Sequence, residues 1–281
     1  MLVNMIDMLN NAKNNNYAVA QFNINNLEWT KFILEENNKL NVPVILGVSE
    51  GAAKYMCGFK TIVNLVENLI QYLGVSIPVA LHLDHGSSFE VCKEAIDAGF
   101  TSVMIDASKY ELNRNIEITK KVVEYAKKYN VSVEAEVGHV GNNNGGNIED
   151  IMYADVEDCT IFCKETQIDF LAPALGSVHG PYVGEPKLNF DRMKEISEIC
   201  NIPLVLHGGS GINDELIEKA IKCGICKINI NTELQQAWAM GVRDGIGNNK
   251  EVYDPRKIIK FGENNLKKVI EEKITLFKTK I

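Results

Sequence analysis

Residues 79–106, VALHLDHGSSFEVCKEAIDAGFTSVMID, contain the pattern that decides the fold. Two short apolar runs, Val79–Leu83 and Ser102–Ile105, have the composition of buried strands. Between them, Glu90–Ala98 carries apolar residues three and four positions apart, which is typical of a helix with one buried face. The segment therefore predicts a strand, a helix and a second strand, with polar residues directly after each strand.

The same alternation extends along the whole chain of 281 residues. Nearly every strand-like run is followed by a helix-like stretch, and no linker rich in Gly, Ser or Pro divides the chain. Eight β/α units in about 250 residues match a (β/α)8 TIM barrel, and a doubly wound open sheet is the rival on this pattern alone. The predicted strands are Tyr17–Phe22, Val42–Val48, Val79–Leu83, Ser102–Ile105, Ser132–Val137, Phe170–Ala172, Pro203–Leu206 and Cys226–Ile230. The predicted helices between them are Asn26–Leu40, Thr61–Leu73, Glu90–Ala98, Asn115–Tyr129, Asp191–Cys200 and Glu215–Cys223.

Additional helices are expected outside the eight units. Met5–Asn14 precedes the first strand, and Pro255–Phe261 and Asn265–Phe277 follow the last. Residues 1–281 are therefore expected to form a single TIM-barrel domain, α/β in class, with additional N- and C-terminal helices. One long stretch, Gly138–Tyr153, has no period, and such a loop is usually either functional and mobile or disordered.

The composition argues against several kinds of partner. The formal net charge of −8 disfavours nucleic acid, because phosphate backbones bind basic surfaces. No apolar run approaches the roughly 18 residues that cross a bilayer, and the N-terminus lacks a signal peptide, so we expect no membrane segment and a cytoplasmic location. The seven scattered cysteines fit reduced thiols. Cys223 and Cys226 have the spacing of a redox pair or half a zinc site, but packing is the favoured interpretation because no second pair exists.

Three of the five histidines fall just after predicted strands. His85 follows the third strand, His179 follows the sixth after a short loop, and His207 follows the seventh. In a TIM barrel the carboxyl ends of the strands meet at one mouth, where catalytic residues collect. Three imidazoles with an open fourth position describe a catalytic zinc site, although any single histidine near a loop could simply be exposed. His82 is expected to pack in the barrel or to support a metal ligand.

Carboxylates and amides end further predicted strands. Asp84 adjoins a candidate zinc ligand and could move a proton at a reacting oxygen, or it could support a ligand or cap a helix. Asp106 and Glu136 end neighbouring strands and could provide a second metal position, or they could form salt bridges inside the barrel. Asn23 and Ser49 end the first two strands and are candidates for substrate binding.

Two glycine-rich segments are candidate phosphate sites. They are Gly176–Gly180 and His207–Gly211, and the second is expected to open the helix after strand seven. TIM barrels often bind phosphate with the loops after strands seven and eight and with a helix N-terminus. Glycine clusters also serve tight turns, but the neighbouring zinc-ligand candidates favour phosphate binding here.

These motifs resemble those of the class II, zinc-dependent fructose-bisphosphate and tagatose-bisphosphate aldolases. The resemblance runs essentially from end to end, and the fold of that family is a TIM barrel. The segments that carry it are 17–26 (YAVAQFNINN), 82–86 (HLDHG), 104–106 (MID), 134–136 (EAE), 174–180 (ALGSVHG), 184–186 (GEP), 207–211 (HGGSG), 227–233 (KININTE) and 253–257 (YDPRK).

The resemblance implies that His85, His179 and His207 hold the catalytic zinc and that Asp84 is the proton donor. Zinc would polarise the ketone of dihydroxyacetone phosphate and stabilise the enediolate formed when a C–H proton leaves. The enediolate would attack the aldehyde of glyceraldehyde 3-phosphate, and Asp84 would protonate the resulting alkoxide. The implied activity is the reversible cleavage of fructose 1,6-bisphosphate into these two triose phosphates.

The resemblance also implies further ligands. Asp106 and Glu136 match a second divalent metal position, and Arg256 matches an arginine that reaches the far phosphate, in some members across a subunit interface. The family suggests a homodimer or homotetramer and a monovalent cation whose site the sequence does not locate. The residues that match the surroundings of dihydroxyacetone phosphate are Gly180, Gly208, Gly209, Ser210, Asn229, Asn231 and Thr232.

Two positions depart from the pattern of that family. Many members carry a Gly-Gly-x-Glu segment after strand five, whose Glu moves the C–H proton, whereas residues 145–150 here, GGNIED, are one residue longer between the glycines and the acid. Glu149 is therefore the candidate, with Asp150 behind it and a solvated surface acid as the alternative. Many fructose-type members have Lys after His-Gly-Pro-Tyr, where this chain has Val183, and the change removes a cationic contact to phosphate.

The sequence thus leaves two functions to weigh. The first is an active zinc aldolase, for which fructose 1,6-bisphosphate is preferred to tagatose 1,6-bisphosphate because Asn231 and the Gly-Pro-Tyr run match the fructose branch, whereas Val183 does not. The second is a catalytically impaired paralogue that binds phosphosugars without turnover. The complete set of zinc histidines and Asp84 favours the active enzyme, with phosphorylated ketoses and trioses as its substrates.

Overall fold

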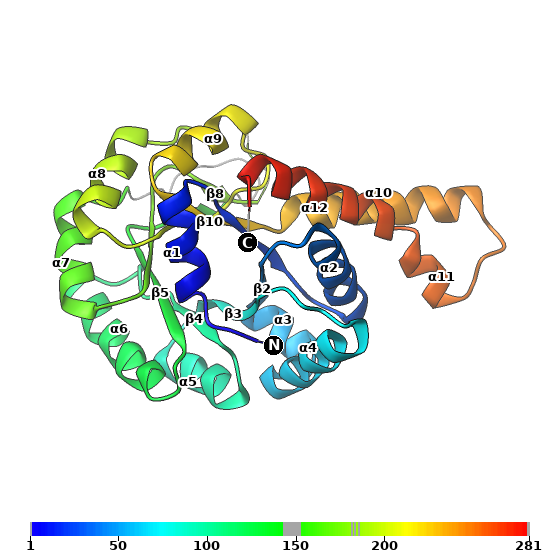
Figure 1. Ribbon diagram of the computed structural model, residues 1–281, viewed down its shortest axis with the longest axis horizontal. Coiled ribbons are helices and arrows are strands. Elements are labelled where there is room, and N and C mark those ends of the chain that lie inside the picture. The colour runs from blue at the N-terminus through cyan, green and yellow to red at the C-terminus, as the bar shows by residue number, and fades with distance from the viewer. Residues whose placement is uncertain (1, 143–152, 181, 183, 185, 280–281) are drawn as a thin grey trace.

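The computed structural model describes residues 2–142, 153–180, 182, 184 and 186–279. Its parallel strands close into a barrel, in the order β1-β10-β9-β7-β5-β4-β3-β2, with helices around it (Figure 1). The predicted (β/α)8 TIM barrel is confirmed, and the doubly wound sheet is excluded because an open sheet would leave two edge strands. The barrel strands are β1 (Val19–Asn23), β2 (Val44–Ser49), β3 (Val79–Gly86), β4 (Ser102–Ile105), β5 (Ser132–Val137), β7 (Phe170–Pro173), β9 (Leu204–Leu206) and β10 (Ile225–Ile230).

Helices connect consecutive strands and cover the outside of the barrel (Figure 1). Every predicted boundary lies within three residues of the observed one. Three observed helices, α3, α7 and α10, have no counterpart in the predicted set, because each is short or buries few residues and so has a weak apolar period. The helices are α1 (Ile6–Asn15), α2 (Leu27–Leu40), α3 (Glu50–Tyr55), α4 (Phe59–Leu73), α5 (Phe89–Ala98), α6 (Leu112–Lys127), α7 (Val156–Thr166), α8 (Phe190–Cys200), α9 (Asp214–Lys222), α10 (Thr232–Asn248), α11 (Pro255–Lys260) and α12 (Glu263–Phe277).

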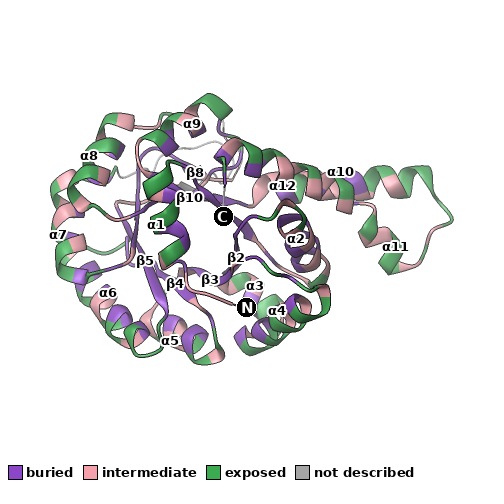
Figure 2. Ribbon diagram, viewed as in Figure 1, coloured by how far each residue is buried: buried purple, intermediate pink, exposed green. Residues whose placement is uncertain are grey.

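Helix α5 shows how the local sequence specifies these elements. The Ser88 side chain accepts a hydrogen bond from the backbone N–H of Val91 and so caps the first turn. Its buried residues, Cys92, Ala95 and Ile96, recur at helical spacing and pack on the barrel. Gly99 ends the helix with a φ of 114°, a left-handed conformation that glycine adopts without a Cβ clash. Figure 2 shows the same pattern around the ring, with buried inner faces and exposed outer faces.

The interior of the barrel is divided into an apolar and a polar half. At the N-terminal ends of the strands, inward side chains such as Val19, Ile45 and Phe170 pack against α1, which closes that end. Because side chains alternate along a strand, the next inward positions lie nearer the mouth, and there several of them are polar. The fully buried polar residues of this upper half include Gln21, His82, Glu134 and Lys227. The apolar half stabilises the barrel and the polar half is available for chemistry.

Two features lie outside the barrel. Helices α10 and α11 project from it as an arm, in which α11 buries no residue (Figures 1 and 2). Strand β6 (Gly141–Asn142), at the start of the stretch predicted to be a loop, pairs with β8 (Val178–His179) near the mouth. Among the described residues, no helix is both long and apolar enough to pass through a bilayer.

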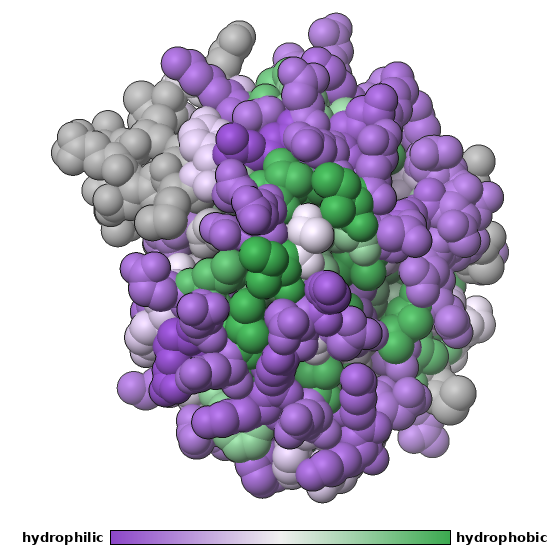
Figure 3. All heavy atoms as spheres, turned by 90° about the vertical axis from the view of Figure 1, so that its left-hand side faces the viewer, coloured by the Kyte–Doolittle hydropathy of each residue, from purple (hydrophilic) through white to green (hydrophobic). Residues whose placement is uncertain are grey.

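The face that carries α6, α7 and α8 is mostly polar, with apolar side chains gathered in its centre (Figure 3). On these helices Ile161 and Ile199 are 39% and 50% exposed.

The C-x-x-C pair, Cys223 and Cys226, lies elsewhere in the structure. Cys226 is buried, its thiol donates to the Gly224 carbonyl at 3.2 Å, and burial raises its pKa to about 12. These observations agree with the packing interpretation of that pair.

Candidate active site

The barrel brings the three predicted zinc histidines to one point at its mouth. His85 ends β3, His179 ends β8 and His207 directly follows β9. The ring centroid of His85 lies 4.9 Å from that of His179 and 4.6 Å from that of His207. One nitrogen from each of the three rings lies within 4.8 Å of the other two, so the group could hold a metal ion. Three imidazole nitrogens of this kind suit zinc.

A distortion of β3 aims two consecutive side chains at the mouth. Neighbouring residues of a regular strand point to opposite faces, which would separate Asp84 from His85. The pairing of β3 with β4 shifts register between Leu83 and Gly86, as at a β-bulge, and His85 has a φ of +56°. A left-handed conformation at a non-glycine residue is strained and concentrates at functional positions. The bulge lets the carboxylate and the imidazole face one cavity.

Three amide groups hold the Asp84 carboxylate. Gln21 Nε2 donates to Oδ2 at 3.0 Å and Asn23 Nδ2 donates to the same oxygen at 2.8 Å, whereas Asn229 Nδ2 lies 3.5 Å from Oδ1. Burial raises the pKa of this carboxyl, but the charges of His85 and other neighbouring cations outweigh it and hold the pKa at about 2. Asp84 is therefore ionised, with Oδ1 less engaged than Oδ2.

The three imidazoles differ in their electrostatics. Burial lowers the pKa of His179 to about 4 and holds that of His207 well below its usual range, so both rings are neutral near pH 7. Burial also lowers the pKa of His85, but its hydrogen bond to Asp106, at 2.8 Å, and the charge of Asp84 raise it to about 9. A cation that binds here must therefore displace one proton from His85.

Asp106 and Glu136 form a second group with His85 that could also hold a metal ion. Burial and the charge of Asp106 raise the pKa of Glu136 to about 8. Its buried Oε2 has no hydrogen-bond partner among the described residues, which leaves a free acceptor at this position. His139 lies at the edge of the same cavity, where its Nδ1 is 3.2 Å from Ser108 Oγ.

The glycine-rich segment after β9 lies at the start of α10, not of α9. Helix α9 begins only at Asp214, with Asn213 as its N-cap, so the expectation that residues 207–211 open this helix is wrong. The Ser210 hydroxyl instead accepts from the backbone N–H groups of Asn231 and Glu233, at 3.3 and 3.4 Å, at the N-terminus of α10. A Cβ at Gly208 or Gly209 would clash with β8 or β10, so only glycine fits there.

One cavity collects most of the predicted site. Its volume is about 120 Å³, and the described residues that line it are Asn23, Asp84, His85, His179, Gly180, His207, Gly208, Ser210, Asn229, Asn231 and Thr232. Asp106 and Glu136 line an adjoining cavity with His85 and His179.

Three comparisons with known proteins can be set beside this geometry. Residues 3–280 match the family model described as fructose-bisphosphate aldolase class-II. The chain belongs to this family. It is 58% identical over 279 residues to a fructose-bisphosphate aldolase of Staphylococcus aureus (strain Mu50 / ATCC 700699), covering 99% of this chain and 98% of the relative. It is 56% identical over 277 residues to the fructose-bisphosphate aldolase of Geobacillus stearothermophilus, covering 98% of this chain and 96% of that protein.

A solved structure gives the same family and fold. The YdjI aldolase from Escherichia coli K12 superposes with a TM-score of 0.87 at 32% sequence identity, and the match covers 99% of this chain and 98% of that one. The aldolase resemblance of the motifs is thus confirmed across the whole barrel. As a member of the class II aldolase family, this chain is an aldolase, which is an enzyme of the lyase class.

Several predicted residues of this aldolase lie away from the cavity. Ser49 caps α3, where its hydroxyl accepts from the backbone N–H of Ala52 at 3.1 Å, and its part in binding stays a prediction. Arg256 lies on the arm, its side chain 88% exposed, with a salt bridge to Asp254 at 2.8 Å. Glu149, Asp150 and Val183 lie outside the described residues.

Three residues near the aldolase site have no role in the sequence-based prediction. Gln21 holds Asp84, and Glu134 with Lys227 forms a buried pair beneath His207. A polar residue two positions before a predicted mouth residue is the signal that could have found them, because residues i and i+2 share a face of a strand. Gln21 precedes Asn23, Glu134 precedes Glu136 and Lys227 precedes Asn229 in this way.

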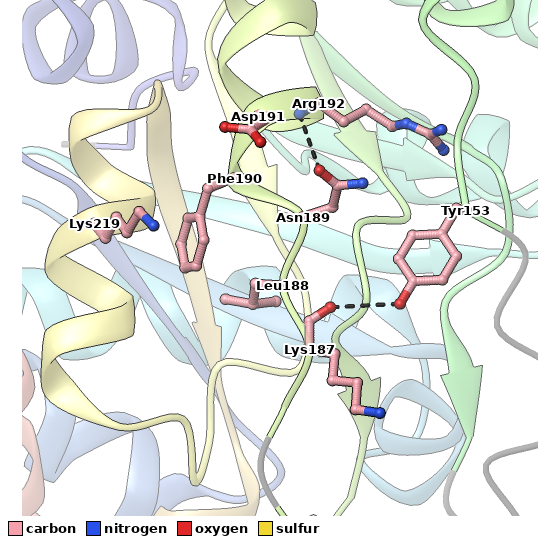
Figure 4. Close-up of a pocket in the computed structure, with 8 residues that line it drawn as sticks. All are labelled: Tyr153, Lys187, Leu188, Asn189, Phe190, Asp191, Arg192 and Lys219. Atoms are coloured by element: carbon pink, nitrogen blue, oxygen red, sulfur yellow. Dashed lines mark hydrogen bonds between the residues drawn. The ribbon is translucent and has the colours of Figure 1, made fainter.

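A larger cavity of about 500 Å³ lies on the outside of the aldolase barrel, between α8 and α9 (Figure 4). Tyr153 Oη donates to the Lys187 carbonyl at 3.4 Å, and the Asn189 side chain accepts from the backbone N–H of Arg192 at 3.1 Å (Figure 4). The Lys219 ammonium lies 4.2 Å from the centroid of the Phe190 ring. None of the predicted site residues lines the described part of this cavity. The described polar contacts of this cavity are local, and the predicted site residues gather at the barrel mouth instead.

Proposed function

We propose that this chain is a zinc-dependent aldolase that reversibly cleaves fructose 1,6-bisphosphate into dihydroxyacetone phosphate and glyceraldehyde 3-phosphate. One observation carries the proposal: three imidazoles, an ionised carboxylate, loop glycines and a helix N-terminus line a single cavity. The relatives named fructose-bisphosphate aldolase support the fructose isomer as the substrate.

The zinc ion would be held by His85, His179 and His207. The donor set fits because it offers three nitrogens and because two of the rings are neutral near pH 7. When bound, the ion supplies a positive charge that polarises the substrate carbonyl. Asp106 and Glu136 would hold a second divalent ion with His85, and the unpartnered Glu136 oxygen supports this position.

Asp84 would move the proton of the substrate hydroxyl. Its Oδ2 is occupied by the amides of Gln21 and Asn23, so Oδ1 is the oxygen that can exchange a proton. In the cleavage direction Asp84 removes the hydroxyl proton, which its ionised form permits, and in synthesis it returns the proton to the alkoxide. Glu149 would move the C–H proton, with Asp150 as the alternative.

Phosphate and sugar hydroxyls would bind around the same cavity. The N-terminus of α10, at Asn231 and Thr232, would offer its positive dipole end to a phosphate, and Gly180 and Gly208 line the cavity beside it. Gly209 would allow close approach of the phosphate without offering its own N–H group, which donates to the Asn229 carbonyl at 3.1 Å. Buried oxygens of Gln21, Asn229 and Asn231 have no partner among the described residues and suit donating hydroxyls or the expected monovalent cation. Ser210, Asn23 and Ser49 would complete the substrate contacts.

We further propose a homodimer or homotetramer built from this single 281-residue domain, working in the cytoplasm. The projecting α10–α11 arm and the apolar centre of the α6–α8 face offer surfaces for contact between copies (Figures 1 and 3). Contact between copies would also bring the exposed Arg256 of one arm near a second cavity, where it could bind the far phosphate.

A coupled assay of triose phosphate release tests the proposal. Fructose 1,6-bisphosphate should be cleaved faster than tagatose 1,6-bisphosphate, a chelator should abolish turnover, and added zinc should restore it. Full activity in protein shown to hold no metal would exclude zinc dependence. Binding of the bisphosphates without product would support the catalytically impaired alternative.

A further inference from the structure

A fully buried ion pair lies beneath His207. Glu134 on β5 and Lys227 on β10 are both 0% exposed, and Lys227 Nζ lies 2.8 Å from Glu134 Oε2. The other carboxylate oxygen, Oε1, lies 2.8 Å from His207 Nε2. Burying a charge pair is costly, and neither residue is among the described residues that line the cavity. Of the three candidate metal ligands, the pair contacts only His207 among the described residues, and the charge of Lys227 also acts on Asp84. Glu134 Oε2 lies 3.6 Å from His82 Nε2 as well.

The contacts of His207 determine which ring nitrogen carries its hydrogen. A carboxylate only accepts hydrogen bonds, so Nε2, which faces Glu134, must carry the hydrogen. The opposite nitrogen, Nδ1, lies 3.3 Å from the Asn229 amide nitrogen, which only donates, so Nδ1 presents its lone pair. Nδ1 also lies 3.0 Å from His85 Nε2 at the mouth. His207 thus offers Nδ1 to a metal.

His85 shows the opposite arrangement. Its Nδ1 faces Asp106 at 2.8 Å, and its Nε2 faces the mouth. The Asp106 side chain is 23% exposed and itself belongs to the second metal group, whereas Glu134 is enclosed and paired with Lys227. The carboxylate behind His207 is therefore fully enclosed, whereas Asp106 is held by Ser108 but is partly exposed.

We propose that Glu134 is a positioning residue of the metal site: it keeps the hydrogen of His207 on Nε2 and leaves Nδ1 to bind zinc, and Lys227 keeps Glu134 in that orientation. The inference rests on the proposed zinc site. Partners of this kind behind metal-binding histidines typically change metal affinity about 10- to 100-fold.

Glu134→Gln separates this role from simple packing. The Lys227 ammonium only donates, so the new amide should turn its oxygen to Lys227 and its NH2 group to His207. Nε2 must then accept, and the hydrogen moves to Nδ1, where it occupies the metal-binding lone pair. The zinc Kd of the chelator-stripped protein, measured by competition with a chromophoric chelator, should rise about 10- to 100-fold.

The double variant Glu134→Gln, Lys227→Met gives the decisive comparison. Without the ammonium, the amide can present its oxygen to His207, so zinc affinity should recover by about tenfold relative to Glu134→Gln alone. Glu36→Gln is the matched control, since Glu36 is also buried (3% exposed) and paired with a lysine, Lys39, at 2.8 Å. This variant should keep the zinc affinity of the wild type.

Nitrogen-15 NMR of the histidine side chains shows directly which ring nitrogen of His207 carries the hydrogen. In the metal-free wild type His207 should carry it on Nε2, and in Glu134→Gln on Nδ1. A hydrogen on Nδ1 in the wild type, unchanged zinc affinity in Glu134→Gln, or a double variant as weak as the single one would overturn the inference. Failure of the wild type to bind zinc would instead refute the proposed metal site, and the NMR result would still test the orientation of His207.

Discussion

Asp84→Asn isolates proton transfer from the rest of the aldolase site. The Asp84 Oδ2 atom accepts from Gln21 and Asn23. Its Oδ1 has longer contacts, 3.5 Å to Asn229 Nδ2 and 3.9 Å to His85 Nε2. An asparagine can therefore place its oxygen where Oδ2 lies and keep the two shorter hydrogen bonds. Its NH2 group would replace Oδ1, the oxygen proposed to exchange the proton.

The expected result is a large loss of turnover with a small loss of stability. Positioned acid–base groups contribute about 100- to 10,000-fold to rate, so kcat for fructose 1,6-bisphosphate should fall by that factor. The weakened charge-assisted hydrogen bonds should lower the free energy of unfolding by about 1 kcal/mol. Coupled kinetics, urea unfolding and zinc content by mass spectrometry measure the three quantities.

A matched substitution distinguishes this loss from a general effect of removing a carboxylate. Asp169, whose side chain accepts from the backbone N–H of Val133 at 2.7 Å, lies just before β7 at the closed end of the barrel. Asp169→Asn should keep wild-type kcat. If Asp84→Asn retains zinc and its kcat stays within about tenfold of the wild type, the role assigned to Asp84 is wrong.

Three further predictions use other parts of the structure. Zinc binding at pH 7 should release close to one proton, because the pKa of about 9 at His85 leaves that ring charged before the metal binds. The zinc affinity should therefore fall about tenfold for each pH unit below 7. Calorimetry in buffers of different ionisation enthalpy measures the release, and a binding enthalpy that is the same in all buffers would contradict it. Gly47→Ala should lower kcat and should lower the free energy of unfolding by about 1–3 kcal/mol, because a Cβ at this position would overlap the Gln21 side chain. A variant that unfolds at the same urea midpoint as the wild type would argue against this overlap. Arg256→Ala should lower kcat/KM about 10- to 100-fold and leave the zinc Kd unchanged, and an unchanged kcat/KM would exclude a phosphate contact.

The sequence predicted the barrel because its signal is repeated and local. Buried parallel strands such as Ser132–Val137 are short apolar runs with distinct ends, and both boundaries of this strand agree with the structure. Helix α10 was not predicted, because it buries only Leu234 and Gly241 in 17 residues and so shows little period. Its N-terminus nevertheless lines the cavity, which the sequence pattern did not indicate.

The positions of the candidate ligands along the chain were enough to identify them, but those positions did not predict how the side chains are oriented. Position after a strand is enough to place His85, His179 and His207 at one mouth. The bulge that aims Asp84 and His85 together depends on how β3 pairs with β4, which no local pattern encodes.

The sequence by itself determined the eight-fold alternation, the residues that end each strand and the family, since these depend on residue type and spacing along the chain. The tertiary structure decided which of those residues meet, that two amides engage Asp84 Oδ2 and leave Oδ1 less engaged, and that a buried pair from β5 and β10 lies beneath His207. The physical reason is that hydrogen bonds and charge interactions act over a few ångströms in space. Closing the barrel brings together residues that are far apart in the sequence, such as Glu134 and Lys227, which are 93 positions apart.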